Sequence, residues 1–554
     1  MKTRATYLFL FLLAALLVVA PAAAQEPVTF TFGEFGNPVQ LDGAVVTDGI
    51  SFRVTRQGCE SLLEFEGDTT NPGPGLASAW EVSEDGLTWT LTLNEGITFH
   101  DGTPFNAEAV KWNFDRWRLT DHPQHYPSQT FEYYSAQWNG FDDESLITAV
   151  EAVDEYTVTI TTSQPIGAFL NNLAMPMFAI HSPSAIEAAG EAYGTPEVGY
   201  SCTGPFQFTS WTSDVEVVLD RYPEYWGEFP GNVERVVLRI IPDTAARLAA
   251  LQAGEIDAFE QPAVEDLETL ANGENTYVQY RPSFNVFYLA FNYRVQEFQN
   301  PLVRRAISLA MNRQEIVDAF YNPDAVAANT FNPPSIAIGF NPDIQTPFDA
   351  EAARAALAEA GYPDGLAEVN ILGVNEDGTL SEEVVETGPL RLYYMPVVRP
   401  YNPDGEGIGE AMVAYLADVG ITAELASAGD WSTYLSERAN GNLTGLYQLG
   451  WTGDNGDPDN FIGYFFANAA TPQVQEGYYQ NEAVAALLQE ARTSTDAAAR
   501  DELYKQAEAL VAEGSDRVFI AHGPVPLAFN RRVSGYVANP LGSELFKYVT
   551  IATN

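Results

Sequence analysis

The sequence predicts an α/β fold that is large enough for more than one lobe. Two observations support this prediction. Segments rich in β-formers alternate with helical patterns along the 554 residues, and glycine follows several helical patterns where a helix normally ends. No short-period repeat or long low-complexity linker interrupts the alternation. A chain of this length exceeds what one hydrophobic core usually organises, so we expect at least two lobes.

The expected strands are rich in β-branched and aromatic residues and partly alternate between apolar and polar positions. They span residues 88–93, 157–160, 215–219, 236–241 and 446–450. The expected helices carry apolar residues at helical spacing. They span residues 244–253, 301–320, 350–360, 410–418 and 496–513, with Gly254, Gly361, Gly420 and Gly514 as the helix-ending glycines. Polar and acidic residues among glycines predict an exposed loop over 375–389.

The N-terminus has the pattern of a secretory signal peptide. Two basic residues precede an apolar run over 7–20, and small residues follow at 21–24. The run is shorter than the roughly 20 residues of a spanning helix, so we expect a cleaved signal over residues 1–24 rather than an uncleaved anchor. The mature protein is then expected to be soluble in the periplasm. Because the first cysteine is Cys59, we expect no lipid-modified N-terminal cysteine.

The chain is strongly acidic, with 27 Lys and Arg against 75 Asp and Glu and a net charge of −48. Such a charge repels nucleic acid and anionic lipid surfaces, so we expect neither as a partner. Two cysteines in an exported protein predict a disulfide between Cys59 and Cys202, with two separate buried thiols as the alternative. Neither cysteine has the neighbouring His and Asp residues of a catalytic thiol.

Three carboxylates lie close together directly after the expected strand 446–450. They are Asp454, Asp457 and Asp459, set among glycines, asparagines and a proline. This composition predicts a tight loop at a strand end, where α/β proteins bind ligands. A carboxylate held there accepts a cationic group. The alternative is a capping or bracing role, which we favour for Asp457 and Asp459. The spacing lacks the calcium-loop pattern, so no metal site is expected.

Several segments resemble the extracellular solute-binding proteins of family 5, which serve peptide ABC importers. They lie at residues 75–86, 98–105, 203–206, 225–226 and 301–312. The resemblance extends from about Val28 to the C-terminus. It implies a two-lobed α/β fold of the type 2 periplasmic-binding-protein class, in its large peptide-binding form. The implied division is lobe I over 25–284 with an extra subdomain at about 60–190, lobe II over 285–523, and a return to lobe I over 524–554.

Two further segments, 399–403 and 451–461, resemble the ligand segments of those family members that bind dipeptides. The resemblance implies that Asp454 pairs with the peptide α-ammonium and Arg399 with its α-carboxylate. An arginine suits the second task because its planar fork bonds both carboxylate oxygens. The other implied ligand-binding positions are Thr47, Asp48 and Gly49 in lobe I and Pro400, Tyr401, Trp451, Thr452 and Gly453 in lobe II. Asp48 departs from the small uncharged residue expected there.

The resemblance also implies how such a protein works. The lobes close on a dipeptide, which is then delivered to a membrane permease served by ATPase subunits. We expect a monomer with no cofactor, no metal and no enzymatic activity.

Two alternative functions remain open. The first is a member of the same family with another ligand, such as an oligopeptide, haem, glutathione or another small solute. The second is a secreted hydrolase. The segment 199–203 fails the G-x-S-x-G pattern at its last position, and the five histidines lack the spacing of a zinc protease. Pairs of carboxylates like those of glycosidases occur by chance in so acidic a chain, so they are weak evidence for an enzyme.

Overall fold

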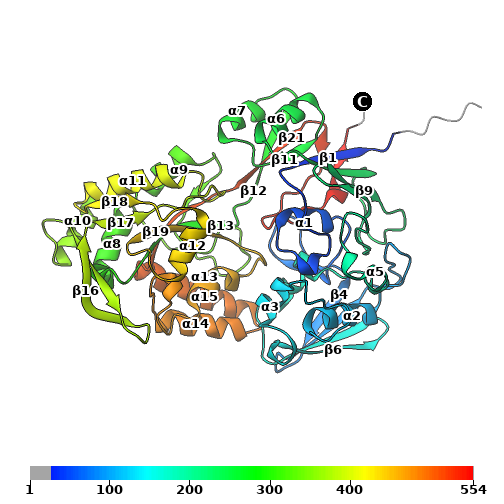
Figure 1. The fold of residues 1–554 in the computed structure, drawn as a ribbon, viewed down its shortest axis with the longest axis horizontal. Coiled ribbons are helices and arrows are strands. Elements are labelled where there is room, and N and C mark those ends of the chain that lie inside the picture. Colours follow the sequence, from blue (N-terminus) through cyan, green and yellow to red (C-terminus); the bar gives the residue numbers. More distant parts are fainter. Residues whose placement is uncertain (1–25, 553–554) are drawn as a thin grey trace, which may run out of the picture.

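The computed structural model describes residues 26–552 and shows two lobes, each built on one large β-sheet (Figure 1). The expected signal peptide therefore lies outside the described residues. Within residues 26–552, no helix is both long enough and apolar enough to cross a membrane.

The sheet of the first lobe has seven strands and brings together the two ends of the chain. Its order is β12 (Thr276–Arg281), β21 (Val525–Asn530), β11 (Ala258–Glu260), β1 (Thr29–Glu34), β10 (Arg235–Ile240), β9 (Glu216–Arg221) and β8 (Phe206–Thr212). Strand β1 pairs in parallel with β10 and β11, whereas the other pairs are antiparallel. Helices α1 (Gly49–Thr55), α6 (Thr244–Ala253) and α7 (Leu267–Ala271) belong to this lobe. The predicted disulfide is confirmed, with a Cα–Cα distance of 4.9 Å between Cys59 and Cys202.

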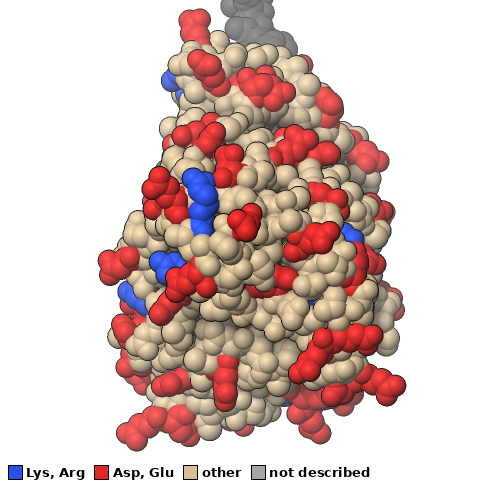
Figure 2. Space-filling view, turned by 90° about the vertical axis from the view of Figure 1, so that its left-hand side faces the viewer, with Lys and Arg blue, Asp and Glu red and all other residues tan. Residues whose placement is uncertain are grey.

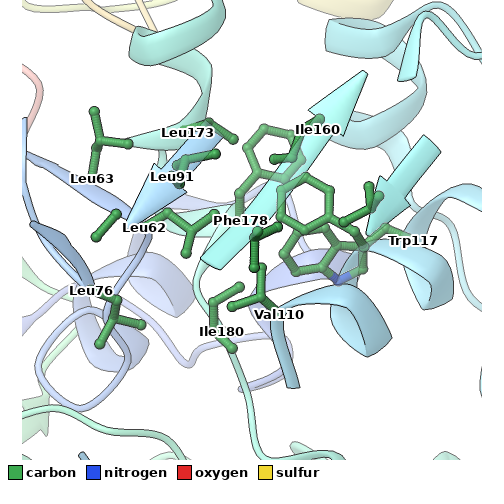
Figure 3. Packing of buried hydrophobic residues seen from close by; sticks show 14 of the residues in the cluster. Leu62, Leu63, Leu76, Leu91, Val110, Trp117, Ile160, Leu173, Phe178 and Ile180 are labelled. Atoms are coloured by element: carbon green, nitrogen blue, oxygen red, sulfur yellow. The ribbon is translucent and has the colours of Figure 1, made fainter. Parts of the chain in front are cut away.

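A subdomain with its own core is inserted after β1. Its antiparallel sheet has the order β4 (Ala77–Val82), β5 (Thr88–Leu93), β7 (Thr157–Thr162) and β6 (Ile147–Asp154). Its helices are α2 (Ala107–Arg118), α3 (Glu132–Trp138) and α4 (Phe169–Leu173). Ile186 of α5 (Pro183–Ala189) instead packs in the core of the large sheet of the first lobe. Figure 3 shows the core, in which Val110 and Trp117 of α2 pack with Leu91 and Ile160 of the sheet. This core holds α3 and α4 at the surface that faces the second lobe.

The sheet of the second lobe has six strands, with β13 near its centre. Its order is β14 (Val326–Ala327), β20 (Arg517–His522), β13 (Asn285–Phe291), β19 (Leu446–Thr452), β17 (Leu390–Tyr393) and β18 (Ala423–Ala426). Every residue of β13 is buried, because helices cover both faces of the sheet. One face packs on α8 (Pro301–Ala310), α9 (Arg313–Phe320), α10 (Ala350–Glu359) and α11 (Gly405–Asp418). The other packs on α12 (Trp431–Ala439), α13 (Ile462–Phe466), α14 (Glu482–Thr493) and α15 (Ala497–Glu513).

The chain passes between the two large sheets twice, at residues 282–284 and at 523–524. Asn285 ties these two connections together. Its Nδ2 donates to the Gly523 carbonyl at 2.6 Å, and the Gly523 N–H donates to its Oδ1 at 2.9 Å. Two adjacent short connections of this kind are the usual structure of a hinge between lobes.

The predicted strands and helices are present, with two differences. The helix predicted over 301–320 is divided into α8 and α9, because Met311 has an extended backbone and Asn312 caps the second helix. Residues 380–388, predicted to lie in a loop, instead form β16 (Leu380–Gly388), which pairs with β15 (Val369–Val374). Strand β16 is mostly exposed and is held by its backbone pairing with β15 rather than by burial, so its sequence lacks an apolar period. Two smaller pairs are β2 (Leu63–Phe65) with β3 (Pro72–Pro74) and β22 (Val533–Ser534) with β23 (Thr550–Ile551).

The excess of acidic residues is spread over the surface. Figure 2 shows the outer face of the second lobe, on which Asp and Glu side chains are scattered widely and Lys and Arg side chains are few. No part of this face gathers positive charge.

Candidate ligand-binding site

A cavity of about 690 Å³ lies between the two lobes. The first lobe and its subdomain contribute Thr47, residues of α3 and the segment 164–168. The second lobe contributes Trp451 near the end of β19, the following loop, and residues of α13 and α14. A cavity bounded by both lobes changes shape when the lobes move, as a closing binding protein requires.

Asp454 lies on the wall of this cavity, two residues after the end of β19. Its backbone N–H donates to Asn460 Oδ1 at 2.8 Å, and its carboxylate accepts a long hydrogen bond from the Tyr133 hydroxyl of the opposite lobe at 3.4 Å. Burial raises the pKa of the Asp454 carboxyl to about 6, and the Asn460 and Tyr133 side chains offset this only in part. Within residues 26–552, no Lys, Arg or His side chain forms an ion pair with it.

The two other carboxylates of the loop do have cationic partners. Both oxygens of Asp457 accept hydrogen bonds from Arg500, at 2.7 and 2.8 Å, and both side chains are buried. Asp457 also caps the short helix η7 (Pro458–Asn460). Asp459 pairs with Arg492 at 2.5 Å. These pairs agree with the bracing role predicted for Asp457 and Asp459, and they leave Asp454 as the carboxylate of this loop that faces the cavity without a cation.

The neighbours of Asp454 differ in what they contribute. Trp451 lines the cavity and stacks on Tyr464, with ring centres 5.0 Å apart. Thr452 pairs with Asn285 in the sheet and its side chain is exposed. Gly453 does not line the cavity, and a Cβ there would fall 2.2 Å from the Phe461 ring. This glycine therefore allows the rings of Phe461 and Phe284 to pack directly against the backbone after the strand.

The Arg399 segment lies beside β19 but outside the 690 Å³ cavity. Arg399 and Asn402 exchange two backbone hydrogen bonds of 2.9 Å, which close a tight turn. The ring of Tyr401 packs directly on Gly450, where a Cβ would lie 2.3 Å away. The Arg399 guanidinium lies 5.9 Å from the ring centre of Trp431, at the start of α12.

Pro400 connects the same segment to the crossover between the lobes. A Cβ at Gly523 would lie 2.2 Å from the Pro400 carbonyl oxygen, so the two backbones are in close contact. The structure thus brings both Asp454 and the Arg399 segment to the C-terminal end of β19. It does not place them on the wall of one cavity.

Only one of the three ligand-binding residues predicted in the first lobe lines the cavity. Thr47 lines the cavity, whereas Asp48 and Gly49 do not. Asp48 caps α1, with its Oδ1 accepting from the Ser51 N–H at 2.8 Å. The additional carboxylate at this position therefore has a role in helix formation.

Tyr133 is a site residue that the sequence did not indicate. It contacts Asp454 across 321 positions of sequence, and Phe52 of α1 packs against its ring with a centre-to-centre distance of 6.0 Å. Two adjacent tyrosines in a short amphipathic segment predict only that their rings pack in a hydrophobic core. No local sequence pattern therefore indicated that Tyr133 lies in the binding site.

The two lobes touch directly beside the cavity. Asn171 Nδ2 donates to the Asn455 carbonyl at 3.0 Å, and Asn455 Nδ2 donates to Asn172 Oδ1 at 2.8 Å. The backbone N–H of Gly167 donates to the Arg492 carbonyl at 2.8 Å. A Cβ at Gly167 would lie 2.3 Å from Arg500 Nε, so this approach of the lobes requires glycine.

Replacing Gly167 with alanine should therefore hinder closure without removing any ligand contact. We expect a larger radius of gyration by small-angle scattering in the presence of ligand and a roughly tenfold loss of affinity, about 1.4 kcal/mol. Gly388→Ala is the matched control, because nothing lies within 4 Å of a Cβ at that position. Equal affinity and equal compaction in the two variants would show that closure does not depend on this contact.

Comparison with known proteins places the chain among binding proteins. The family model for bacterial extracellular solute-binding proteins, family 5, matches residues 71–473. The Dipeptide-binding protein of Escherichia coli (strain K12) is 32% identical, and the match covers 97% of each chain. Heme-binding protein A of Haemophilus influenzae is also 32% identical, with 94% of this chain and 92% of that protein covered. The structure of HbpA2 from Haemophilus parasuis superposes with a TM-score of 0.83 at 31% identity, covering 95% of this chain and all of that one.

Proposed function

Because the chain belongs to family 5 of the bacterial extracellular solute-binding proteins, we propose that it captures free dipeptides between its lobes for an ABC importer. The observation that supports this most is the Asp454 carboxylate. It faces a cavity between the lobes without a cationic partner in the described chain, while its two neighbours in the loop are paired. The α-ammonium of a bound peptide is the cation that would form an ion pair with the Asp454 carboxylate.

The second end of the ligand is assigned to Arg399. The ends of an extended dipeptide lie roughly 7 Å apart, so a site that pairs with both ends measures length as well as charge. Arg399 is half-buried, and no carboxylate pairs with it within residues 26–552. The backbone between the two charged groups, at the end of β19, is then available to bond the peptide amide as an added strand.

The similarity to a haem-binding relative leaves a second ligand class to test. Haem iron in proteins is held by His, Cys, Met or Tyr. The cavity wall carries no His, Cys or Met among the described residues. Its two tyrosines already have contacts, because the Tyr133 hydroxyl donates to Asp454 and Tyr464 stacks on Trp451. Charged and carboxamide side chains outnumber apolar ones on the wall of this cavity. Its polar wall therefore favours a charged, hydrogen-bonding ligand over haem.

The decisive experiment is calorimetry with a ligand series. Ala-Ala should bind with micromolar affinity, about 8 kcal/mol, whereas N-acetyl-Ala-Ala and Ala-Ala-amide should bind at least about 30-fold more weakly. Ala-Ala-Ala and a pentapeptide should also bind weakly, and no peptide should be hydrolysed. Arg399→Ala should abolish the preference for the free acid over the amide while it preserves the preference for the free amine. Binding of haem or glutathione with no binding of dipeptides would contradict the proposal.

Dipeptide binding should depend on pH through Asp454. Protonation of this carboxyl, whose pKa is raised to about 6 by burial, removes the charge that the ammonium needs. Affinity should therefore fall as the pH drops below about 6, and binding near that pH should release protons because the bound ammonium lowers the pKa. Above about pH 8 the affinity should fall again, since the α-amino group loses its proton. Calorimetry in buffers of different ionisation enthalpy measures both effects, and an affinity that is flat between about pH 5 and 7 would contradict them.

The proposal includes the organisation and location of the protein. Sheet membership supports a lobe I formed by residues 25–284 and 524–554 and a lobe II formed by 285–523. We propose that residues 1–24 are removed on export and that the mature protein is a soluble periplasmic monomer that docks on a permease served by ATPase subunits. N-terminal sequencing of the exported protein and light scattering test the first two statements.

A further inference from the structure

The formal charges on the cavity wall do not balance. The wall carries three carboxylates and one guanidinium, from Glu132, Asp454, Asp459 and Arg492. Arg492 is occupied, because its Nε pairs with Asp459 at 2.5 Å and its Nη2 donates to the Gly463 carbonyl at 3.0 Å. Asp454 is assigned to the peptide ammonium. Glu132 remains as a second negative charge without a partner.

Glu132 is well placed to meet a ligand. It is the first residue of α3 and directly precedes Tyr133, whose hydroxyl contacts Asp454. Its side chain is exposed to the cavity, and it forms neither an ion pair nor a hydrogen bond with any residue of 26–552. A solvated carboxylate on the wall of the same cavity attracts a second cationic group on the same ligand.

The rest of the wall is suited to a polar side chain. Eight carboxamides line the cavity, from Gln137, Asn139, Gln164, Asn172, Asn455, Asn460, Asn468 and Gln489. Carboxamides both donate and accept hydrogen bonds, so they solvate a charged or strongly polar group. A volume of about 690 Å³ leaves room for a long side chain and for water around it.

The direction of the cavity identifies which peptide residue it serves. The cavity extends from Asp454 to α3 and α14, whereas Arg399 lies outside it, over Trp431 at the start of α12. The side chain of the first peptide residue leaves the Cα that carries the α-ammonium, and therefore starts at Asp454. The second side chain starts one residue closer to Arg399.

On the basis of the proposed dipeptide function, we propose that Glu132 is a specificity residue that makes this cavity a pocket for a basic side chain at the first position of the dipeptide. A lysine or arginine side chain there pairs with Glu132 while the α-ammonium pairs with Asp454. An acidic side chain meets the unpaired carboxylate of Glu132 and finds Arg492 already held by Asp459.

Calorimetry with Lys-Ala, Ala-Lys, Ala-Ala and Glu-Ala at about 0.15 M salt, where long-range fields are screened, tests this assignment. The expected order is Lys-Ala above Ala-Ala above Glu-Ala, with steps of about fivefold, as one partly solvated charge pair contributes. Ala-Lys should bind like Ala-Ala. Glu132→Gln should remove the preference for Lys-Ala over Ala-Ala, and Glu132→Lys should reverse the order of Lys-Ala and Glu-Ala.

Glu108→Gln is the matched control, because Glu108 is an exposed acid in the first turn of α2 and does not line the site. It should preserve every preference. Equal binding of Lys-Ala and Ala-Lys above Ala-Ala, or equal effects of the two glutamine variants, would assign the preference to the overall negative charge and overturn the role of Glu132. If Ala-Ala binds but Lys-Ala binds no better, this inference alone fails, whereas absence of binding by all four dipeptides contradicts the proposed function itself.

Discussion

Asp454→Asn should weaken dipeptide binding by about 2–5 kcal/mol, or roughly 30-fold to several thousand-fold. The substitution preserves the shape of the side chain and its acceptor for the Tyr133 hydroxyl, but it removes the negative charge. The peptide ammonium would then be taken out of water without a counter-charge, which is the main cost in a closed site. Isothermal calorimetry with Ala-Ala measures the effect directly.

Two controls make the result specific to Asp454. Asp377→Asn changes the same chemical group on the exposed turn between β15 and β16 and should leave the affinity unchanged. N-acetylated Ala-Ala has no ammonium, so its weak binding should be nearly the same in wild type and Asp454→Asn. Wild-type affinity for Ala-Ala in the Asp454→Asn variant would rule out the ammonium assignment.

Asp457→Ala should destabilise the fold by about 3–5 kcal/mol, because it leaves a buried guanidinium without its counter-charge. Burial alone lowers the pKa of Arg500, but the negative charge of Asp457 and its two hydrogen bonds to the guanidinium outweigh this and raise the pKa. Without the carboxylate, the loop that carries Asp454 also loses the cap of η7. Urea unfolding followed by circular dichroism measures the change in the free energy of unfolding.

The double variant Asp457→Ala/Arg500→Met should recover part of this loss, since the unpaired charge is then absent. Arg239→Ala is the matched surface control. The Arg239–Glu255 pair has side chains that are 43% and 56% exposed, so its loss should cost less than about 1 kcal/mol. A cost for Asp457→Ala as small as that for Arg239→Ala would mean that the loop does not depend on the buried pair.

The local elements of the fold follow closely from sequence patterns. Strand β5 and helix α6 have the predicted bounds, 88–93 and 244–253, because apolar period, capping and terminal glycine agree there. The helix predicted over 301–320 is an element for which the apolar period and the capping pattern disagree. Its apolar pattern continues across residues 311 and 312, but Asn312 begins a new helix by capping it.

Some features of the candidate site were likewise predicted from the sequence, whereas others are seen only in the structure. Carboxylates among glycines after a buried strand predicted the loop that carries Asp454. The ligand with two charged ends was implied by the resemblance of residues 399–403 and 451–461 to the ligand segments of dipeptide-binding family members. The sequence also predicted that Asp457 and Asp459 brace this loop, but not which arginines hold them. Arg500 is 43 positions away from Asp457 in sequence, and an arginine on a helix has no local pattern that names its partner.

The alternation of strands and helices and the carboxylate loop could be derived from neighbouring residues, because backbone preference, side-chain period and turn chemistry are local properties. The disulfide was predicted from the presence of two cysteines in an exported chain, although they are 143 positions apart. The contacts across the cavity could not be derived from neighbouring residues. Tyr133 meets Asp454 and Glu132 shares its cavity because two separately packed cores bring α3 and the loop after β19 together. Gly167 meets Arg492 because the same packing brings the segment before α4 against α14. Which segments face each other across such an interface depends on how whole lobes pack, and this is a property of the complete fold.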